Sequence, residues 1–237
     1  MEDCNLLNKN YIRIKNMNMV SYGGNQSWCK NKKLQKAGCG VLAMADLTIY
    51  FAEQNPGMMT DAIRRINKPN GLYNKNDYLA YVRWFNRHYV VYLMHNGLTG
   101  IAIMNTMNRY FIINDISLRA RWKLFLSDDS MMKEIKHMIK RDRPVILSVG
   151  PNTPNVFGKK GVNFYVAKEG RLLNSVKKDV KSHFAVVTGV TSICDKEYLI
   201  VSSWGKEYYI NYEEYRDYVK NSGGRMTSSL LSIRADV

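Results

Sequence analysis

A cysteine stands between two glycines, directly before a long apolar run that ends at Phe51. The thiolate is the nucleophilic form of cysteine, and the partial positive charge at a helix N-terminus lowers the pKa of a thiol. If a helix begins at Gly40, Cys39 lies at that N-terminus, and Gly38 and Gly40 leave room for a substrate backbone. These residue types in this order predict a nucleophilic cysteine; a core cysteine beside a helix cap is the alternative.

A nucleophilic cysteine needs a base, most often a histidine that the fold brings close. Of the four histidines, His183 opens the apolar run HFAVVTGV, which predicts a histidine at the start of a buried strand. His88 and His137 lie in charged helical segments and are expected on the surface, and His95 precedes an Asn-Gly turn. His183 is therefore the candidate base, and a structural histidine at a strand end is the alternative.

The stretch LIVSSWGKEYYI at 199–210 contains the candidate third group. An apolar strand ends there in two serines, which are followed by Trp-Gly and a second strand. A polar side chain at this point could orient the imidazole through its Nδ1 hydrogen, as the third member of a catalytic triad does. Cys39, His183 and Ser202 thus follow one another as nucleophile, base and orienting group.

These segments resemble the motifs of papain-like cysteine peptidases, in particular the group related to the double-glycine leader peptidases of bacteriocin exporters. The matching pieces are Gln26-Ser27-Trp28, Gly38-Cys39-Gly40, Pro144-Val145-Ile146, the run at 183–189 and SSWG at 202–205. The helical segments between 58 and 142 match no motif of that family. The resemblance implies a papain-like fold and thiol-dependent peptide hydrolysis that needs no cofactor.

The resemblance also implies an oxyanion hole. A glutamine upstream of the cysteine lines this hole in such families, and Gln26 is its counterpart through the adjoining Trp28. Gln35 is the rival because it lies closer to Cys39 in sequence.

One position departs from the family pattern. Asparagine or aspartate usually stands where this chain has Ser202. A serine hydroxyl accepts a hydrogen bond from imidazole, but it is neutral and short and holds the ring less firmly. Either Ser202 is an adequate orienting group, another residue such as Asp195 or Asn174 replaces it, or the site is impaired.

The other cysteines, at 4, 29 and 194, form no CxxC pair, and the histidines do not supply closely spaced metal ligands. Zinc sites need such paired ligands, so we expect neither a metal site nor a cofactor. A disulfide framework is not expected in a chain of this size without a secretion signal. Most of the thiols should therefore be free.

The elements that must position these residues are helical in the first half of the chain. Residues 40–54 form an apolar run that Asn55-Pro56-Gly57 stops, which predicts a central buried helix. Residues 1–37 are polar and turn-rich around a short extended piece. Helical periodicity also covers 58–66, 76–87, 97–110 and 128–141.

The second half consists of short β-branched or aromatic runs separated by turn residues. The runs are PVILSVG, GVNFYVAK, HFAVVTGV, EYLIVSSW, EYYINY and SLLSIRA, with a short helix at 211–220. This order argues for an α+β class with an antiparallel sheet. We expect one papain-like domain over 1–237, built from two interlocked lobes. A mainly helical lobe (about 1–142) would pack its central helix on a mainly β lobe (143–237).

The chain has 237 residues, of which 46% are hydrophobic, enough for a sizeable core, and its net charge is +15. Such a charge attracts anionic partners, but the nucleic-acid docking motifs that should accompany it are missing, so no specific nucleic acid is expected. No run approaches the roughly 18 apolar residues of a membrane span. The N-terminal sequence lacks the apolar core of a signal peptide, which predicts a cytoplasmic location.

We expect an enzyme, a cysteine peptidase or other amide hydrolase acting on a peptide or protein. Basic clusters at 30–33 and 176–181 would suit an acidic substrate, although solvated surface lysines are the simpler interpretation. The first alternative is a catalytically impaired papain-like scaffold with a binding or regulatory role, which Ser202 motivates. The second is a basic protein that acts on an anionic partner. The scissile bond, transfer or deamidation in place of hydrolysis, and the oligomeric state stay open.

Overall fold

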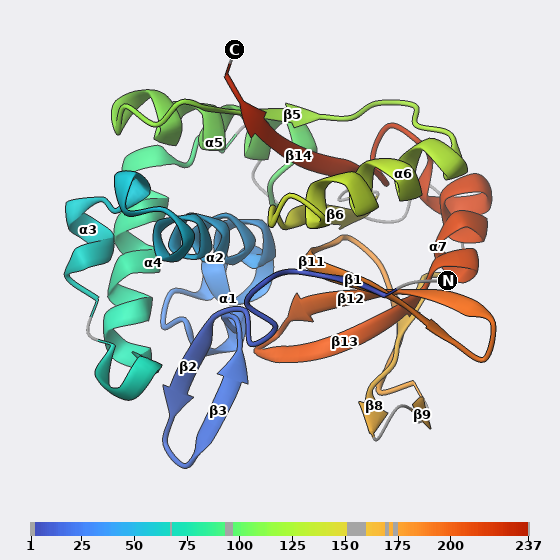
Figure 1. Cartoon of the computed structure of the whole chain (residues 1–237), viewed down its shortest axis with the longest axis horizontal. Coiled ribbons are helices and arrows are strands. Elements are labelled where there is room, and N and C mark those ends of the chain that lie inside the picture. Colours follow the sequence, from blue (N-terminus) through green and yellow to red (C-terminus); the bar gives the residue numbers. More distant parts are fainter. Residues whose placement is uncertain are drawn as a thin grey trace. The chain divides into compact units, whose positions relative to one another are not determined.

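The computed structural model describes residues 3–66, 68–92, 97–150, 160–168, 171–172 and 175–236. The chain forms two compact units, and Figure 1 labels their helices and strands. The first unit comprises Met1–Lys9, Trp122–Ser202 and Glu207–Ser232, and the second comprises Asn10–Arg121, Ser203–Lys206 and Ile233–Val237. Separate segments of the chain thus alternate between the units, whereas the composition suggests a single change near 142–144.

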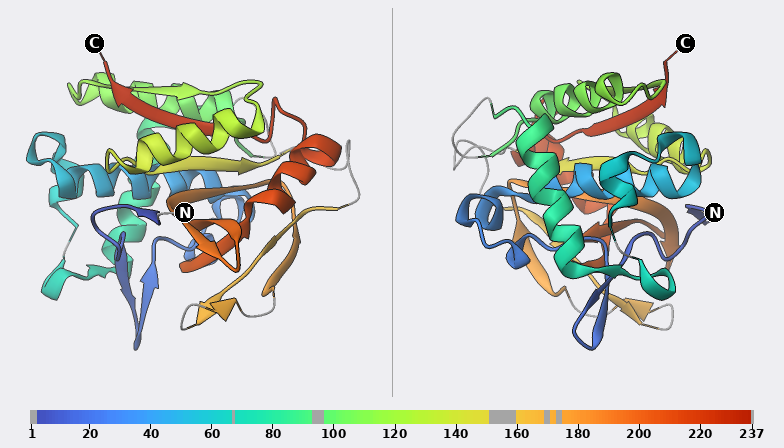
Figure 2. Two further views of the ribbon diagram at one scale, coloured as in Figure 1. Left: turned by 45° about the vertical axis from the view of Figure 1, so that its right-hand side comes forward. Right: turned by 90° about the vertical axis from the view of Figure 1, so that its left-hand side faces the viewer.

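Helices dominate the second unit. They are α1 (Lys32–Ala37), α2 (Cys39–Gln54), α3 (Asp61–Arg64), α4 (Lys75–Tyr89) and α5 (Gly100–Ile113). The 3₁₀ turn η1 (Gln26–Trp28) precedes α1, η2 (Pro56–Met58) lies between α2 and α3, and η3 (Pro69–Gly71) lies between α3 and α4. Helix α2 packs against both α4 and α5 (Figure 2).

Helix α2 begins and ends for reasons visible in the sequence. Gly38 is its N-cap, and Asn55 is its C-cap, after which Pro56 starts a 3₁₀ turn. Every residue from Gly40 to Ala52 is buried. A helix that is apolar on nearly every face must be covered on all sides to be stable in water. The predicted buried helix over 40–54 is therefore confirmed.

The other helices of this unit follow the sequence less closely. The segments predicted at 76–87 and 97–110 correspond to α4 and α5. The segment at 58–66 forms only the four-residue α3, because Met59 and Thr60 have extended backbones and the Thr60 hydroxyl caps the helix at Ile63. Helix α1 was not predicted. Its cap is Asn31, whose side chain accepts from two backbone N–H groups of the first turn.

The second unit also contains a small sheet. Strands β2 (Arg13–Asn16) and β3 (Met19–Tyr22) form an antiparallel hairpin, and β2 pairs in parallel with β4 (Tyr73–Asn74). Met17 has a φ of 55°, as a tight two-residue hairpin turn requires. The extended piece expected within 1–37 corresponds to this hairpin.

A sheet forms the centre of the first unit, in the order β13–β12–β11–β6–β14. These strands are β6 (Val145–Val149), β11 (His183–Ile193), β12 (Lys196–Ser203), β13 (Lys206–Asn211) and β14 (Leu230–Ala235). Strand β11 is antiparallel to both β6 and β12. All of β6 is buried, and so is β11 from His183 to Val190. At its far end β14 enters the second unit, where it lies beside β5 (Leu118–Trp122).

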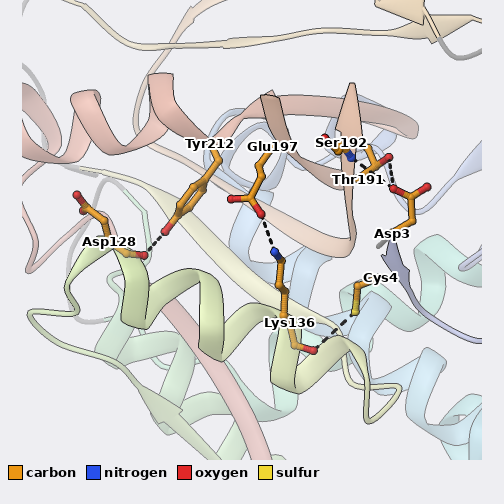
Figure 3. Close-up of polar contacts among 8 residues, drawn as sticks. All are labelled: Asp3, Cys4, Asp128, Lys136, Thr191, Ser192, Glu197 and Tyr212. Atoms are coloured by element: carbon orange, nitrogen blue, oxygen red, sulfur yellow. Dashed lines mark hydrogen bonds and ion pairs between the residues drawn. The ribbon is translucent and has the colours of Figure 1, made fainter. Parts of the chain in front are cut away.

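Smaller elements surround this sheet. They are β1 (Cys4–Asn5), β7 (Val162–Phe164), β8 (Ala167–Lys168), β9 (Arg171–Leu172), β10 (Lys177–Val180), α6 (Asp128–Ile139), α7 (Tyr212–Tyr218) and the π-helical turn η4 (Val219–Gly223). Helix α6 packs on β1, β6 and β11. Figure 3 shows polar contacts at this helix, where Lys136 pairs with Glu197 and its carbonyl accepts from the Cys4 thiol.

The structure confirms the mixed α+β class with antiparallel pairing. Five of the six predicted strands are present as single strands, whereas the run at 161–168 forms two short strands, β7 and β8. The predicted helix after β13 is also present. Strand β5 was not predicted, although Leu118 and Ala120 are buried and alternate with exposed Arg119 and Arg121. The packing of α2 on the sheet stays a prediction.

Candidate active site

Cys39 is the first residue of α2 and is partly accessible. A helix of sixteen residues places its partial positive charge at this thiol. Gly38 is required here for a steric reason. A Cβ on Gly38 would lie 2.2 Å from the Leu34 carbonyl oxygen, the group that accepts the Gly38 N–H at 2.9 Å. The described geometry therefore explains Gly38 by the tight passage from α1 to α2, and clearance for a substrate stays a prediction.

The other three cysteines have different environments. None of the four cysteines forms a disulfide, so the predicted absence of a disulfide framework is confirmed. Cys4 and Cys29 are buried, and burial raises the pKa of each thiol. Cys194 is exposed in the turn between β11 and β12. Cys39 thus combines partial accessibility with a helix N-terminus.

Gln26 and Gln35 bind η1 and α1 to each other. The Gln26 Nε2 donates to the carbonyl oxygens of Gln35 at 3.0 Å and Lys36 at 3.4 Å. The Gln35 Nε2 donates in return to the Ser27 carbonyl at 3.2 Å. The Gln26 amide thus lies at the last turn of α1, three residues before Cys39. To stabilise an oxyanion, this amide would have to release at least one backbone carbonyl.

A buried carboxylate fixes the chain just before η1. Asp46, in the middle of α2, accepts from the Gly24 N–H at 2.9 Å and from the Tyr78 hydroxyl at 2.6 Å. It is only 3% exposed, and burial raises its pKa to about 7. Gly24 allows this contact, because a Cβ there would lie 1.9 Å from the Tyr78 oxygen. Our sequence reasoning missed Asp46, although a lone carboxylate in an apolar helix is a recognisable exception.

His183, in the first unit, is the first residue of β11 and is 5% exposed. Its backbone pairs with Val149 of β6, and its ring centroid lies 6.1 Å from that of Phe164 in an edge-on arrangement. Burial lowers the imidazole pKa to about 3 because the charged form loses its hydration. The ring is therefore neutral at pH 7. The expected histidine at the start of a buried strand is confirmed.

Ser202 lies on β12, next to β11, and is 4% exposed. Its register partner is Val186, and β11 pairs with β6 without a shift from His183 to Val187. Since successive side chains of a strand point to opposite faces, Ser202 shares the face of Val186, whereas His183 lies on the other face with Ala185. The register therefore argues against Ser202 as the group that orients the imidazole.

The two substitutes considered for Ser202 differ in position. Asp195 lies in the turn at the far end of the β11–β12 hairpin. Ten residue steps of about 3.3 Å separate that end of β11 from His183, so Asp195 cannot reach the imidazole. Asn174 lies outside the described residues.

The other histidines take no part in this site. His88 is exposed on α4, with its ring stacked on Trp84 at 4.5 Å, and His137 is exposed on α6 beside Arg141. Both were expected on the surface. His95 lies outside the described residues.

Among the residues with described positions, no three His, Cys, Asp or Glu side chains are grouped so as to hold a metal ion. The same residues include no helix that is long and apolar enough to span a membrane.

The sequence matches no protein-family model, and a comparison with curated proteins finds no match. The arrangement of residues must therefore carry any functional argument. The second unit brings together Cys39, Gln26 and Gln35 around α1 and the start of α2. The first unit holds His183 and Ser202 on adjacent strands, with their side chains on opposite faces.

Proposed function

We propose that this protein is a cysteine peptidase or related amide hydrolase with a papain-like fold, in which Cys39 is the nucleophile and His183 the base. The observation that carries the proposal is the position of Cys39. It is a partly accessible thiol on the first residue of a long buried helix, and Gln26 of η1 donates to carbonyl oxygens in the last turn of α1, which directly precedes that helix. Helix N-termini favour thiolates.

In this mechanism His183 takes the Cys39 proton and the sulfur adds to the amide carbonyl. The amine leaves with the proton returned by the imidazole, and water then hydrolyses the thioester to regenerate the thiol. The Cys39 backbone N–H and the Gln26 amide stabilise the oxyanion. No step requires a metal or a cofactor. The substrate is a peptide or protein.

Neutral His183 is in the form that accepts a proton. Its burial also makes it a weak base, because imidazolium lacks hydration there. Since Ser202 shares the face of Val186, the simplest catalytic arrangement is a dyad of thiol and imidazole without a serine as the third member.

The same two observations support a second candidate, a papain-like scaffold that binds a partner and no longer catalyses. A buried imidazole with a depressed pKa and an orienting position on the other sheet face are both expected of an impaired site. Fold alone does not separate the two candidates.

A cleavage assay distinguishes them. A mixture of unlabelled peptides is incubated with the wild type, with Cys39→Ala and with the matched control Cys194→Ala, and new termini are identified by mass spectrometry. A peptidase produces new termini with the wild type and with Cys194→Ala but not with Cys39→Ala. Equal product with all three proteins, or no product with any, would contradict the peptidase.

A further inference from the structure

A pocket of about 470 Å³ opens in the second unit between η1 and α4. Three of its lining side chains are cationic, one is an indole, one is an amide and one is aliphatic. They are Trp28, Lys30, Lys75, Asn76, Leu79 and Arg83. No carboxylate is among them, so the pocket has an uncompensated positive charge.

The spacing on α4 builds one wall of this pocket. Lys75, Leu79 and Arg83 are four residues apart, so they form one stripe along the helix. Leu79 is buried and forms an apolar floor between the two cationic ends. Asp77, the acidic residue of this helix, lines a different pocket with Ala62 and Arg65.

Neutral partners hold Lys75 in place. The Lys75 ammonium donates to the Asn16 amide oxygen at 2.9 Å and lies 5.8 Å from the centroid of the Trp28 ring. Burial raises the pKa of the Cys29 thiol, and the positive charge of Arg83 partly offsets this rise. Within the part of the chain that the structure describes, no ion pair involves Lys30, Lys75 or Arg83.

We propose that this pocket binds the carboxylate side chains of an acidic peptide segment, and that it selects acidic substrates for Cys39. Trp28 belongs to the same 3₁₀ turn as Gln26, which donates to the Lys36 carbonyl in the last turn of α1, so a peptide anchored here would lie along this turn. Carboxylates would pair with the three cations, the Asn76 amide would serve a peptide bond, and Leu79 with Trp28 would cover an aliphatic stem. The substrate part of this inference rests on the proposed peptidase function; the binding part does not.

The test uses a fluorescein-labelled hexaglutamate peptide and measures its anisotropy with the full Cys39→Ala chain, so that no turnover interferes. Salt at 0.15 M limits the diffuse attraction of the net charge to about 8 Å. We expect saturable binding that hexaglutamine does not show. Neutralising one cation should weaken binding about two- to fivefold, and Lys75→Gln with Arg83→Gln together about tenfold.

The matched control is Lys32→Gln with Lys36→Gln, which removes the same charge from exposed positions of α1 outside the pocket. Arg83→Lys keeps the charge and should keep most of the affinity. Circular dichroism verifies that each variant folds, and Lys30→Gln, in a loop, replaces any variant that does not.

Equal weakening by the pocket pair and by the α1 pair would overturn the proposal, because binding would then follow net charge alone. Inorganic pyrophosphate that displaces the peptide at a lower concentration than free hexaglutamate would also overturn it, in favour of a phosphate site. If the pocket binds hexaglutamate as expected but Cys39 shows no enhanced reactivity, the peptidase fails and the acidic-peptide site stands.

Discussion

The buried carboxylate of Asp46 should make the stability of the protein depend on pH in an unusual direction. Burial raises its pKa from 3.8 to about 7 in the folded protein. The folded state therefore binds a proton that the unfolded chain releases above pH 4. The resulting stabilisation is fully present below about pH 4 and is lost as the pH rises through 7.

The magnitude follows from the same two values. A shift of about three units at about 1.4 kcal/mol each amounts to about 4 kcal/mol over the whole range. Between pH 5 and pH 8 the loss should be about 2.5 kcal/mol. Asp46→Asn removes the ionisation and keeps an oxygen that can accept from the Gly24 N–H. From pH 5 to pH 8, the free energy of unfolding of this variant should therefore rise by about 2.5 kcal/mol relative to that of the wild type.

The assay is urea denaturation of both proteins at pH 5, 6, 7 and 8, followed by circular dichroism. With a slope of about 2 kcal/mol/M, the difference between the two midpoints should change by about 1 M from pH 5 to pH 8. Asp61→Asn, at a side chain that is 81% exposed, is the control and should leave the profile unchanged. Parallel profiles for the wild type and Asp46→Asn would refute the reasoning.

Three further outcomes are expected. His183 has a folded pKa of about 3 against an ordinary 6.5, so the free energy of unfolding should fall by about 2 kcal/mol as the pH falls from 7 to 5. His183→Gln should remove most of this pH dependence, whereas the exposed His88→Gln should not. Gly24→Ala should lower the free energy of unfolding by about 1–3 kcal/mol, because its Cβ would overpack against Tyr78. In Gly57→Ala the Cβ would meet the Asn55 side chain at 3.2 Å, and the loss measured by thermal unfolding should be less than about 0.5 kcal/mol. Lys136 and Glu197 (Figure 3) form an ion pair with an N–O distance of 2.6 Å, and both side chains are about a quarter exposed. A double-mutant cycle should therefore give a coupling energy of about 0.5–1 kcal/mol that falls in 1 M salt. A coupling energy unchanged by salt would contradict a screened ion pair.

The sequence predicts those elements whose limits are local. Asn55 and Pro56 end α2 by their own backbone preferences, and the apolar run from Gly40 gives its burial. Each strand of the second half is a short apolar or aromatic run between turn residues, so its place can be predicted without knowing its partner. Helix α1 was not predicted because its cap, Asn31, stands in a lysine-rich stretch that resembles a loop.

Features that depend on pairing between distant residues could not be predicted. The face that Ser202 occupies follows from its register with Val186, which a shift between Val187 and Gly189 of the hairpin sets. The contact of Asp46 with the Gly24 N–H joins residues 22 positions apart. The first residues of the chain belong to the first unit because β1 pairs with β11. The local sequence around these residues does not indicate which distant residues they contact.

The measurement that tests the central claim most directly is the rate of iodoacetamide alkylation at each cysteine, resolved by mass spectrometry between pH 5 and 9. Exposed Cys194 serves as the reference thiol within the same chain. If Cys39 is a nucleophile activated by the start of α2 and by His183, it should react about tenfold faster than Cys194 at pH 6.5, and His183→Gln should remove that advantage. Cys39 and Cys194 reacting with the same pH profile in both proteins would contradict the account.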